Sequence, residues 1–156
     1  MDNQQNIEQE IFSKLARLCS RSEECSPDLR KKITEMGGDQ DMADRILQRL
    51  QEEKYQDDER YVRAYVRDKF RLNQWGRVKM RYYLKMKGLK DPIIEKGFGE
   101  IDEDQYVSLL KKTMKDKAKT IKKKEKYEKM AQVIRFAQGR GFEPELIHRY
   151  LQETVS

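Results

Sequence analysis

The residues best suited to chemistry in this chain are the basic side chains of its central segment, residues 60–90. This segment contains eleven Lys or Arg residues and one acid, Asp68. Guanidinium and ammonium groups donate charge-assisted hydrogen bonds to carboxylates and phosphates, and arginine can donate two in parallel. The segment therefore predicts a surface that binds a polyanion or an acidic protein.

A helical wheel separates the basic residues of this segment from its apolar ones. Arginines recur every three or four residues on one face. The residues that fall on the opposite, core-facing side are Tyr61, Val62, Tyr65, Val66 and Phe70. Trp75 follows in a turn and is expected to be exposed. The alternative is an ordinary solvated helix face, although such a face usually carries interspersed acids. The predicted partner-binding residues are Arg60, Arg63, Arg67, Arg71, Trp75, Arg77, Arg81 and Lys85.

A second basic run, residues 111–126, contains nine lysines. An apolar stripe runs along it through Val107, Leu110, Met114 and Ile121, so we expect its start to be an amphipathic helix with lysines on the outer face. Such lysines contact phosphates without reading base sequence, and a merely solubilising helix or a membrane-surface helix are the alternatives. The candidate DNA contacts are Lys111, Lys112, Lys115, Lys119, Lys122 and Lys123.

The residue types needed for catalysis or metal binding are not assembled in this sequence. The acids at 57–59 stand where a helix begins, and we expect them to cap its free backbone N–H groups. His148 is the one histidine, and Cys19 and Cys25 are the two cysteines, which we expect to be reduced, with Cys19 buried. We therefore predict no catalytic, cofactor-binding or metal site and a protein that is not an enzyme.

Composition limits the class of protein further. The chain has 156 residues, of which 37% are hydrophobic and 40% charged, with a net charge of +6, so its core is modest. No apolar run approaches the roughly 20 residues of a membrane-spanning helix, and the first residues are polar and acidic, unlike a signal peptide. We expect a cytoplasmic monomer that does not bind membranes.

The elements that must position these residues are predicted to be helices throughout. Ser26 and Pro27 mark one helix start, as a side-chain cap followed by proline. Three glycines that end helices, Gly37, Gly88 and Gly141, lie 51 and 53 residues apart, and an apolar residue stands eight positions before each. Such a period predicts stacked repeats, each a long helix followed by two shorter ones.

We therefore predict an all-α fold, an elongated tandem array of three three-helix repeats. The predicted repeats are residues 1–56, 57–101 and 102–156.

The central segment also resembles a known family, the RecX regulators of the bacterial RecA recombinase. The matching pattern is an aspartate, an aromatic and apolar helix, a glycine-containing turn, a basic helix and a Leu-x-x-Lys-Gly-hydrophobic sequence. It is carried by Asp58, Tyr61, Tyr65, Val66, Trp75, Gly76 and Arg81, by residues 84–89, and in the N-terminal unit by residues 18–22 and 29–33.

The resemblance implies tandem three-helix repeats that bind RecA along the groove of its filament on DNA. It also implies that the protein restrains filament growth and lowers recombinase and coprotease activity. The expected partners are the RecA filament and DNA, reached directly or through the filament. The alternative function is sequence-independent binding of DNA or RNA by a helical protein, using both basic regions.

Overall fold

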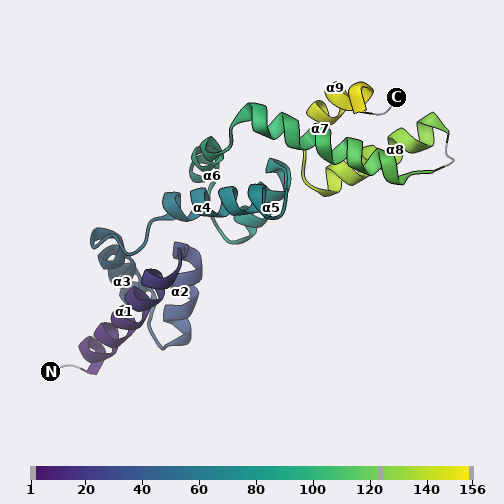
Figure 1. Ribbon diagram of the computed structural model, residues 1–156. Coiled ribbons are helices and arrows are strands. Elements are labelled where there is room, and N and C mark those ends of the chain that lie inside the picture. Colours follow the sequence, from purple (N-terminus) through teal and green to yellow (C-terminus); the bar gives the residue numbers. More distant parts are fainter. Residues whose placement is uncertain (1–2, 123–124, 155–156) are drawn as a thin grey trace. The chain divides into compact units, whose positions relative to one another are not determined.

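The computed structural model describes residues 3–122 and 125–154. In these residues all regular structure is helical, with nine α-helices, one short 3-10 helix and no strand (Figure 1). The elements are α1 (Asn3–Arg21), α2 (Ser26–Glu35), α3 (Gln40–Glu52), α4 (Asp58–Arg71), α5 (Arg77–Met86), α6 (Asp91–Gly97), η1 (Phe98–Glu100), α7 (Glu103–Thr120), α8 (Lys126–Gly139) and α9 (Pro144–Thr154). The order of one long and two shorter helices occurs three times, which confirms the all-α prediction and the three-helix repeats.

The chain forms two compact units. Unit 1 comprises Met1–Ala64 and Met86–Gly97, and unit 2 comprises Tyr65–Lys85 and Phe98–Ser156. Residues 57–97 therefore contribute to both units, and the predicted boundaries of the three repeats stay a prediction. No helix in the described part of the chain is both long enough and apolar enough to cross a membrane.

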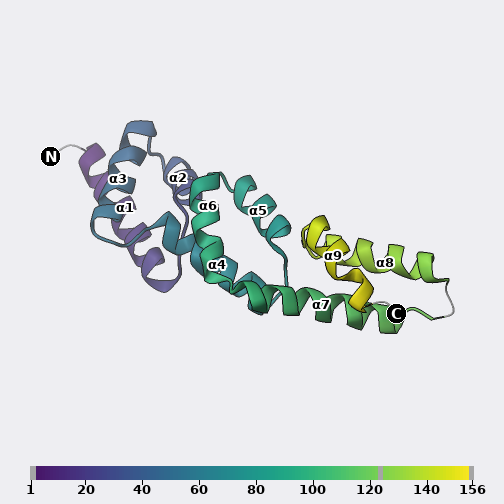
Figure 2. The same cartoon turned by 90° about the horizontal axis from the view of Figure 1, so that it is seen from above.

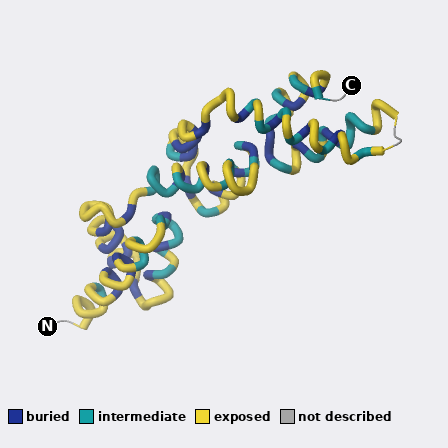
Figure 3. The backbone as a smooth tube through the Cα atoms, viewed as in Figure 1, coloured by how far each residue is buried: buried dark blue, intermediate teal, exposed yellow. Residues whose placement is uncertain are grey.

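The core of unit 1 lies between α1, α2 and α3. The buried residues of these three helices form one apolar cluster. The tube marks buried stretches in dark blue (Figure 3). Leu15, Ile33 and Leu50 are each at most 1% exposed, and the apolar positions on each helix recur at helical spacing. At the start of α3, the Asp39 carboxylate accepts the Met42 N–H at 2.9 Å, so that a free backbone donor is satisfied.

A polar network ties the start of α4 to the start of α2. Asp57 caps α4, because its carboxylate accepts the N–H groups of Glu59 and Arg60 at 2.9 and 3.1 Å. Asp58 instead accepts the Ser26 hydroxyl at 2.5 Å and the side-chain amide of Gln56 at 2.8 Å. The capping role expected for the acids is therefore confirmed for Asp57.

Two expectations near α2 are wrong. The N-cap of α2 is Cys25, Ser26 is already helical, and the Ser26 hydroxyl donates to the Asp58 carboxylate instead of capping the helix. Cys25 is the buried cysteine, whereas Cys19, on the last turns of α1, is only half-buried against the edge of the core. Burial raises the pKa of the Cys25 thiol to about 11.

The three helix-ending glycines share one backbone conformation. Gly37, Gly88 and Gly141 have φ values of +95°, +98° and +96°, in the left-handed region where a side chain is disfavoured. Each lies two residues beyond the end of the second helix of its group, α2, α5 or α8. The apolar residues eight positions earlier, Leu29, Met80 and Val133, are all 0% exposed. The sequence period therefore marks the same structural position in each of the three three-helix repeats.

In unit 2, α7 packs against α8 and α9 (Figure 2). Its buried side chains include Tyr106, Leu110 and Met114, which are all 0% exposed. The turn between α4 and α5 lies against the turn between α8 and α9, since the Gly76 N–H donates to the Arg140 carbonyl at 2.7 Å. This contact fixes the position of the turn that carries Gln74 and Trp75.

Candidate functional site

The first predicted surface is the arginine stripe, which we define as Arg60, Arg63, Arg67 and Arg71 of α4. Opposite it, Val62 and Val66 are 0% exposed and form the buried side of the helix. Tyr61, Tyr65 and Phe70 are half-buried, so their predicted position on the core side is confirmed only in part. Helix α4 thus presents its arginines away from the valines that anchor it.

Arg60 is held by acids and carbonyls of its own unit. Its Nε lies 2.9 and 2.8 Å from the two carboxylate oxygens of Glu23, and its Nη2 donates to the Tyr55 carbonyl at 3.1 Å. Hydrogen bonding to Glu23 raises the pKa of Arg60. Arg60 therefore joins α4 to the turn after α1 and to the turn after α3, which gives it a structural role within unit 1.

The remaining arginines of the stripe are exposed. Arg63 forms an ion pair with Glu59 one turn earlier, and Arg67 Nη1 lies 4.0 Å from a carboxylate oxygen of Glu100. The side chain of Arg71 has no hydrogen bond or ion pair with another described residue. Exposed ion pairs of this kind contribute only about 0–1 kcal/mol, so an incoming carboxylate can replace the present one. The acids that pair with the arginines of residues 60–90 thus come from outside that segment.

Arg77, at the start of α5, is a largely enclosed predicted contact. Its side chain is 18% exposed and lies 2.8 Å from Glu143 and 2.9 Å from Glu103. Its guanidinium also stacks over the Tyr106 ring, 3.9 Å from the ring centre. Burial alone would lower the pKa of Arg77, but the two carboxylates raise it above its ordinary value. Arg77 therefore links α5, α7 and the start of α9.

Tyr106 and Glu143 complete this arrangement, and the sequence offered no signal for either. The Tyr106 hydroxyl accepts the Arg77 backbone N–H at 2.9 Å and donates to Glu143. Burial, followed by the hydrogen bond to Glu143, raises the pKa of Tyr106. The hydrogen bonds among Arg77, Tyr106 and Glu143 are made within the protein, which is typical of a structural network rather than of a ligand-binding site.

The last two predicted contacts of α5 differ in their surroundings. The guanidinium of Arg81 lies over the Phe98 ring, 5.1 Å from its centre, and its side chain is half-buried. Lys85, one turn later, is exposed. Both residues belong to unit 2.

Trp75 belongs to an aromatic cluster, which we define as Trp75, Tyr82 and Tyr83. The rings of Trp75 and Tyr83 lie 5.2 Å apart, and Tyr82 meets Tyr83 edge-on at the same distance. Trp75 is half-buried rather than exposed, because the ammonium groups of Lys69 and Lys79 lie over it at 4.8 and 4.6 Å. Tyr82 and Tyr83 are the more exposed members, at 60% and 42%.

The lysine run is divided between different faces of α7. Lys111 pairs with Glu153 of α9 at 2.9 Å, and Lys112 pairs with Asp116 at 2.6 Å. Lys115, Lys119 and Lys122 are exposed. The remaining candidate, Lys123, lies outside the described residues. Val107 is half-buried, whereas Leu110 and Met114 are buried, so the apolar stripe predicted for this helix lies mainly in the core of unit 2.

Within the described ranges 3–122 and 125–154, no cluster of His, Cys, Asp or Glu could hold a metal ion. The same ranges contain no buried side-chain nitrogen or oxygen that lacks a hydrogen-bond partner. The surface groups described above are cationic and aromatic side chains, which are suited to recognising acidic partners.

Comparison with known proteins identifies the family. Residues 57–97 match the model of the second three-helix domain of RecX, and residues 103–151 match that of the third. The regulatory protein RecX of Vibrio vulnificus is 31% identical over 139 residues, which cover 89% of each chain. The regulatory protein RecX of Clostridium perfringens strain SM101 is 30% identical over 128 residues, and the match spans 81% of this chain but only 59% of that protein.

A solved structure supports the fold independently. The crystal structure of RecX from Lactobacillus salivarius is similar at a TM-score of 0.88 and 17% identity, and the match covers 96% of this chain and 97% of that one. At this identity the likeness concerns the fold, whereas the sequence match to the Vibrio protein extends over nearly the whole of both chains. The chain is a member of the RecX family of regulatory proteins.

Proposed function

We propose that this protein regulates the RecA recombinase by binding the RecA filament on DNA and restraining it, without catalysing a reaction. The observation that carries the proposal is the match to a regulatory protein RecX over 89% of both chains. Because the chain spans only 59% of the clostridial relative, its activity is argued from its own surface as well. We place the protein in the cytoplasm, acting as a monomer.

The proposed contact residues within unit 2 are Arg67, Arg71, Trp75, Arg81 and Lys85, and Arg63 continues the stripe along α4. Ion pairs at exposed positions are weak, so acidic groups of a partner can displace Glu59 from Arg63 and Glu100 from Arg67. Arg60 and Arg77 contribute by positioning, since carboxylates of their own units already hold them.

The aromatic cluster supports the same surface. Trp, Tyr and Arg are the side chains that most often dominate the energy of protein interfaces. The packed rings of Trp75 and Tyr83 are held in place by neighbours, so they lose little conformational entropy on binding. Cationic neighbours such as Lys69 and Lys79 would favour a partner surface that carries acids.

A triple substitution tests the arginine stripe. We expect R63A/R67A/R71A to weaken inhibition of the RecA ATPase by about tenfold or more, because three exposed donors are lost together. The matched control is K14A/R17A/R21A, which removes three exposed charges from α1 at similar spacing. Circular dichroism would verify that both variants remain folded. Inhibition that is unchanged in the first variant, or equally reduced in both, would contradict the assignment.

The second candidate function is sequence-independent binding of nucleic acid. It is favoured by the exposed ammonium groups of Lys115, Lys119 and Lys122, which have no ion pair with a described residue. Lysines of this kind neutralise phosphates as point charges and report no base sequence.

A further inference from the structure

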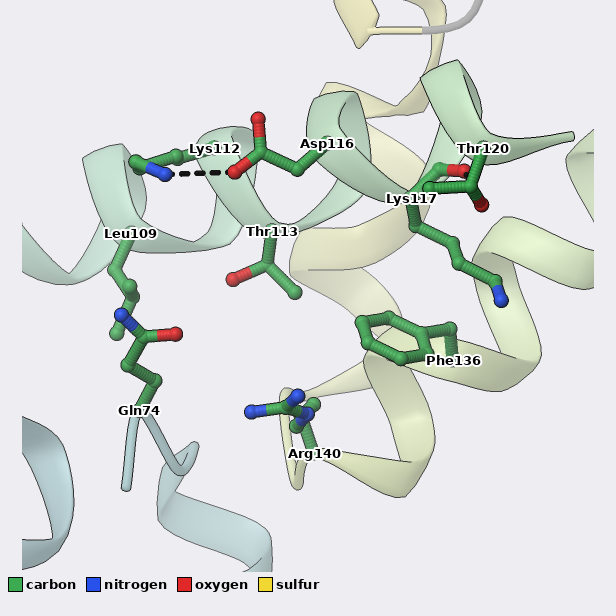
Figure 4. Close-up of a pocket in the computed structure, with 9 residues that line it drawn as sticks. All are labelled: Gln74, Leu109, Lys112, Thr113, Asp116, Lys117, Thr120, Phe136 and Arg140. Carbon is green, nitrogen blue, oxygen red and sulfur yellow. Dashed lines mark hydrogen bonds and ion pairs between the residues drawn. The ribbon is translucent and has the colours of Figure 1, made fainter. Parts of the chain in front are cut away.

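A pocket in unit 2 lies between α7 and α8, closed on one side by the turn after α4 (Figure 4). Its volume is about 290 Å³, near the lower end of the range for small-molecule sites. The lining residues are Gln74, Leu109, Lys112, Thr113, Asp116, Lys117, Thr120, Phe136 and Arg140. None of these belongs to the surface proposed above.

The pocket uses one face of α7. Its lining positions on this helix recur three and four residues apart, from Leu109 to Thr120, so they form a single stripe. Of the lysine run, this stripe includes Lys112 and Lys117, whereas Lys115 and Lys119 fall outside it. The pocket is therefore distinct from the diffuse charge of the rest of the helix.

Positive charge in the pocket is not balanced by the pocket's own acid. The Asp116 carboxylate already pairs with Lys112 at 2.6 Å. Lys117 and Arg140 have no ion pair with any residue in the described part of the chain, yet each cationic group lies 5.0 Å from the centre of the Phe136 ring. Figure 4 shows them approaching that ring from different sides. An anion beside either cation would offset its positive charge.

Neutral donors complete the lining. The Thr113 hydroxyl and the Gln74 amide make no hydrogen bond to another described residue, and both lie at the space between α7 and Arg140 (Figure 4). Gln74 has a φ of 57°, a left-handed conformation that costs about 1 kcal/mol or more outside glycine. Its neighbours hold it there, since the Trp75 N–H donates to the Lys69 carbonyl at 3.0 Å and the Gly76 N–H to Arg140.

We propose that this pocket binds a phosphate ester. A phosphate group presents several oxygens in different directions, which suits the Arg140 guanidinium, the Thr113 hydroxyl and the Gln74 amide on one side of the Phe136 ring. The Lys117 ammonium lies on the other side of that ring, where it can meet a neighbouring group of the same ligand (Figure 4). A carboxylate has only two oxygens in one plane and would leave part of this donor set unused. Phe136 supplies an apolar wall for the sugar or base attached to the phosphate.

The neighbouring surface indicates which source of phosphate to test first. A second hollow of about 340 Å³ shares Lys117 and Phe136 with the pocket and adds Arg135 and Gln132. A nucleic-acid strand that places one phosphodiester in the pocket could continue along this hollow, beside a further cation. A free nucleotide would fill the pocket alone. The inference does not depend on RecA, so either proposal can fail without the other.

Matched charge removals test the site. A fluorescently labelled single-stranded oligodeoxynucleotide would be titrated with wild-type protein, K117Q and K14Q, and anisotropy would be measured. Both variants lose one lysine, but only Lys117 lines the pocket, whereas Lys14 is exposed on α1. We expect K117Q to weaken binding about tenfold and K14Q less than about twofold. T113V, which keeps the shape but removes the hydroxyl, should weaken binding about threefold.

Two further probes identify the source of the phosphate. In the first, adenosine monophosphate is added and the NMR chemical shifts of Thr113 and Phe136 are followed. If those signals move in wild type but not in K117Q, the inference is supported with a free ester as the ligand. Binding of the oligonucleotide alone, with the same dependence on Lys117, supports it with a strand as ligand. Equal losses in K117Q and K14Q, no binding of either probe, or preference for a glutamate-rich peptide of equal charge would overturn it.

Discussion

The arginines of the central segment differ in how firmly carboxylates of the same chain hold them. Arg60 contacts both carboxylate oxygens of Glu23 and also the Tyr55 carbonyl, and Arg77 pairs with both Glu143 and Glu103. Arg63 pairs with Glu59 on the surface of α4, and Arg67 Nη1 lies 4.0 Å from Glu100; exposed pairs of this kind are weak. Side chains of one type and similar spacing thus divide into structural residues and residues available to a partner.

Glu143 is expected to matter more for stability than Glu103, although both pair with Arg77. Glu143 is 28% exposed and also accepts the Tyr106 hydroxyl, whereas Glu103 is 61% exposed. We expect E143Q to lower the free energy of unfolding by about 1.5–2 kcal/mol and E103Q by less than about 1 kcal/mol. Urea titration followed by circular dichroism would measure both. Equal losses in the two variants would mean that the Arg77–Glu143 and Arg77–Glu103 pairs contribute equally to stability.

At the scale of elements, the three repeats use the same helix ending in different surroundings. A Cβ added to Gly37 meets nothing within 4 Å, whereas one added to Gly141 would lie 2.3 Å from the Lys79 Cβ and 2.8 Å from its backbone nitrogen. Gly141 also lies where the α4–α5 turn meets the α8–α9 turn. One repeated position therefore serves as a simple helix ending in the first repeat and as a close contact in the third.

These surroundings predict unequal costs for one substitution. G37A should lower the free energy of unfolding by about 1 kcal/mol, because alanine is strained at positive φ. G141A adds a steric clash against backbone and should cost about 3 kcal/mol or more. Thermal unfolding of the two variants gives the comparison. A smaller loss for G141A than for G37A would show that the two turns of unit 2 separate easily.

At the scale of the whole molecule, the net charge of +6 is concentrated rather than spread. Residues 60–90 hold eleven basic groups and one acid, and residues 111–126 hold nine basic groups and two acids. In the structure, many of these cations form ion pairs with acids from other parts of the chain. These acids include Glu23, Glu100, Glu143 and Glu153. The field available to an outside polyanion is therefore weaker than the sequence suggests.

This balance predicts which DNA the protein prefers. At about physiological salt, we expect tighter binding to RecA-coated single-stranded DNA than to the same DNA bare. The reason is that salt weakens contacts to a protein surface less than it weakens contacts to phosphates. Anisotropy between about 50 and 200 mM salt would give both affinities and their salt dependence. Tighter binding to bare DNA, with a steep loss as salt rises, would favour the second candidate function.

The sequence by itself determined the helices, their grouping and the family. Gly37, Gly88 and Gly141 revealed the repeat because a left-handed helix ending requires a residue without a side chain, a local property that needs no partner. The valines at 62 and 66 fell on the buried side of α4 because helical periodicity is equally local. The resemblance of the central segment rested on the same kind of short-range pattern.

Tertiary structure alone decided which of the basic side chains are already paired with acids of the same chain. The acids that hold Arg60 and Arg77 lie 37 and 66 residues away in the chain, and no helical spacing relates them. The pocket of unit 2 likewise combines Gln74, Lys117 and Arg140, which come from three separate elements. Ion pairing and pocket formation depend on how elements pack, whereas helix formation and helix endings depend on neighbours along the chain. That physical difference explains why the sequence could predict the scaffold but not the site.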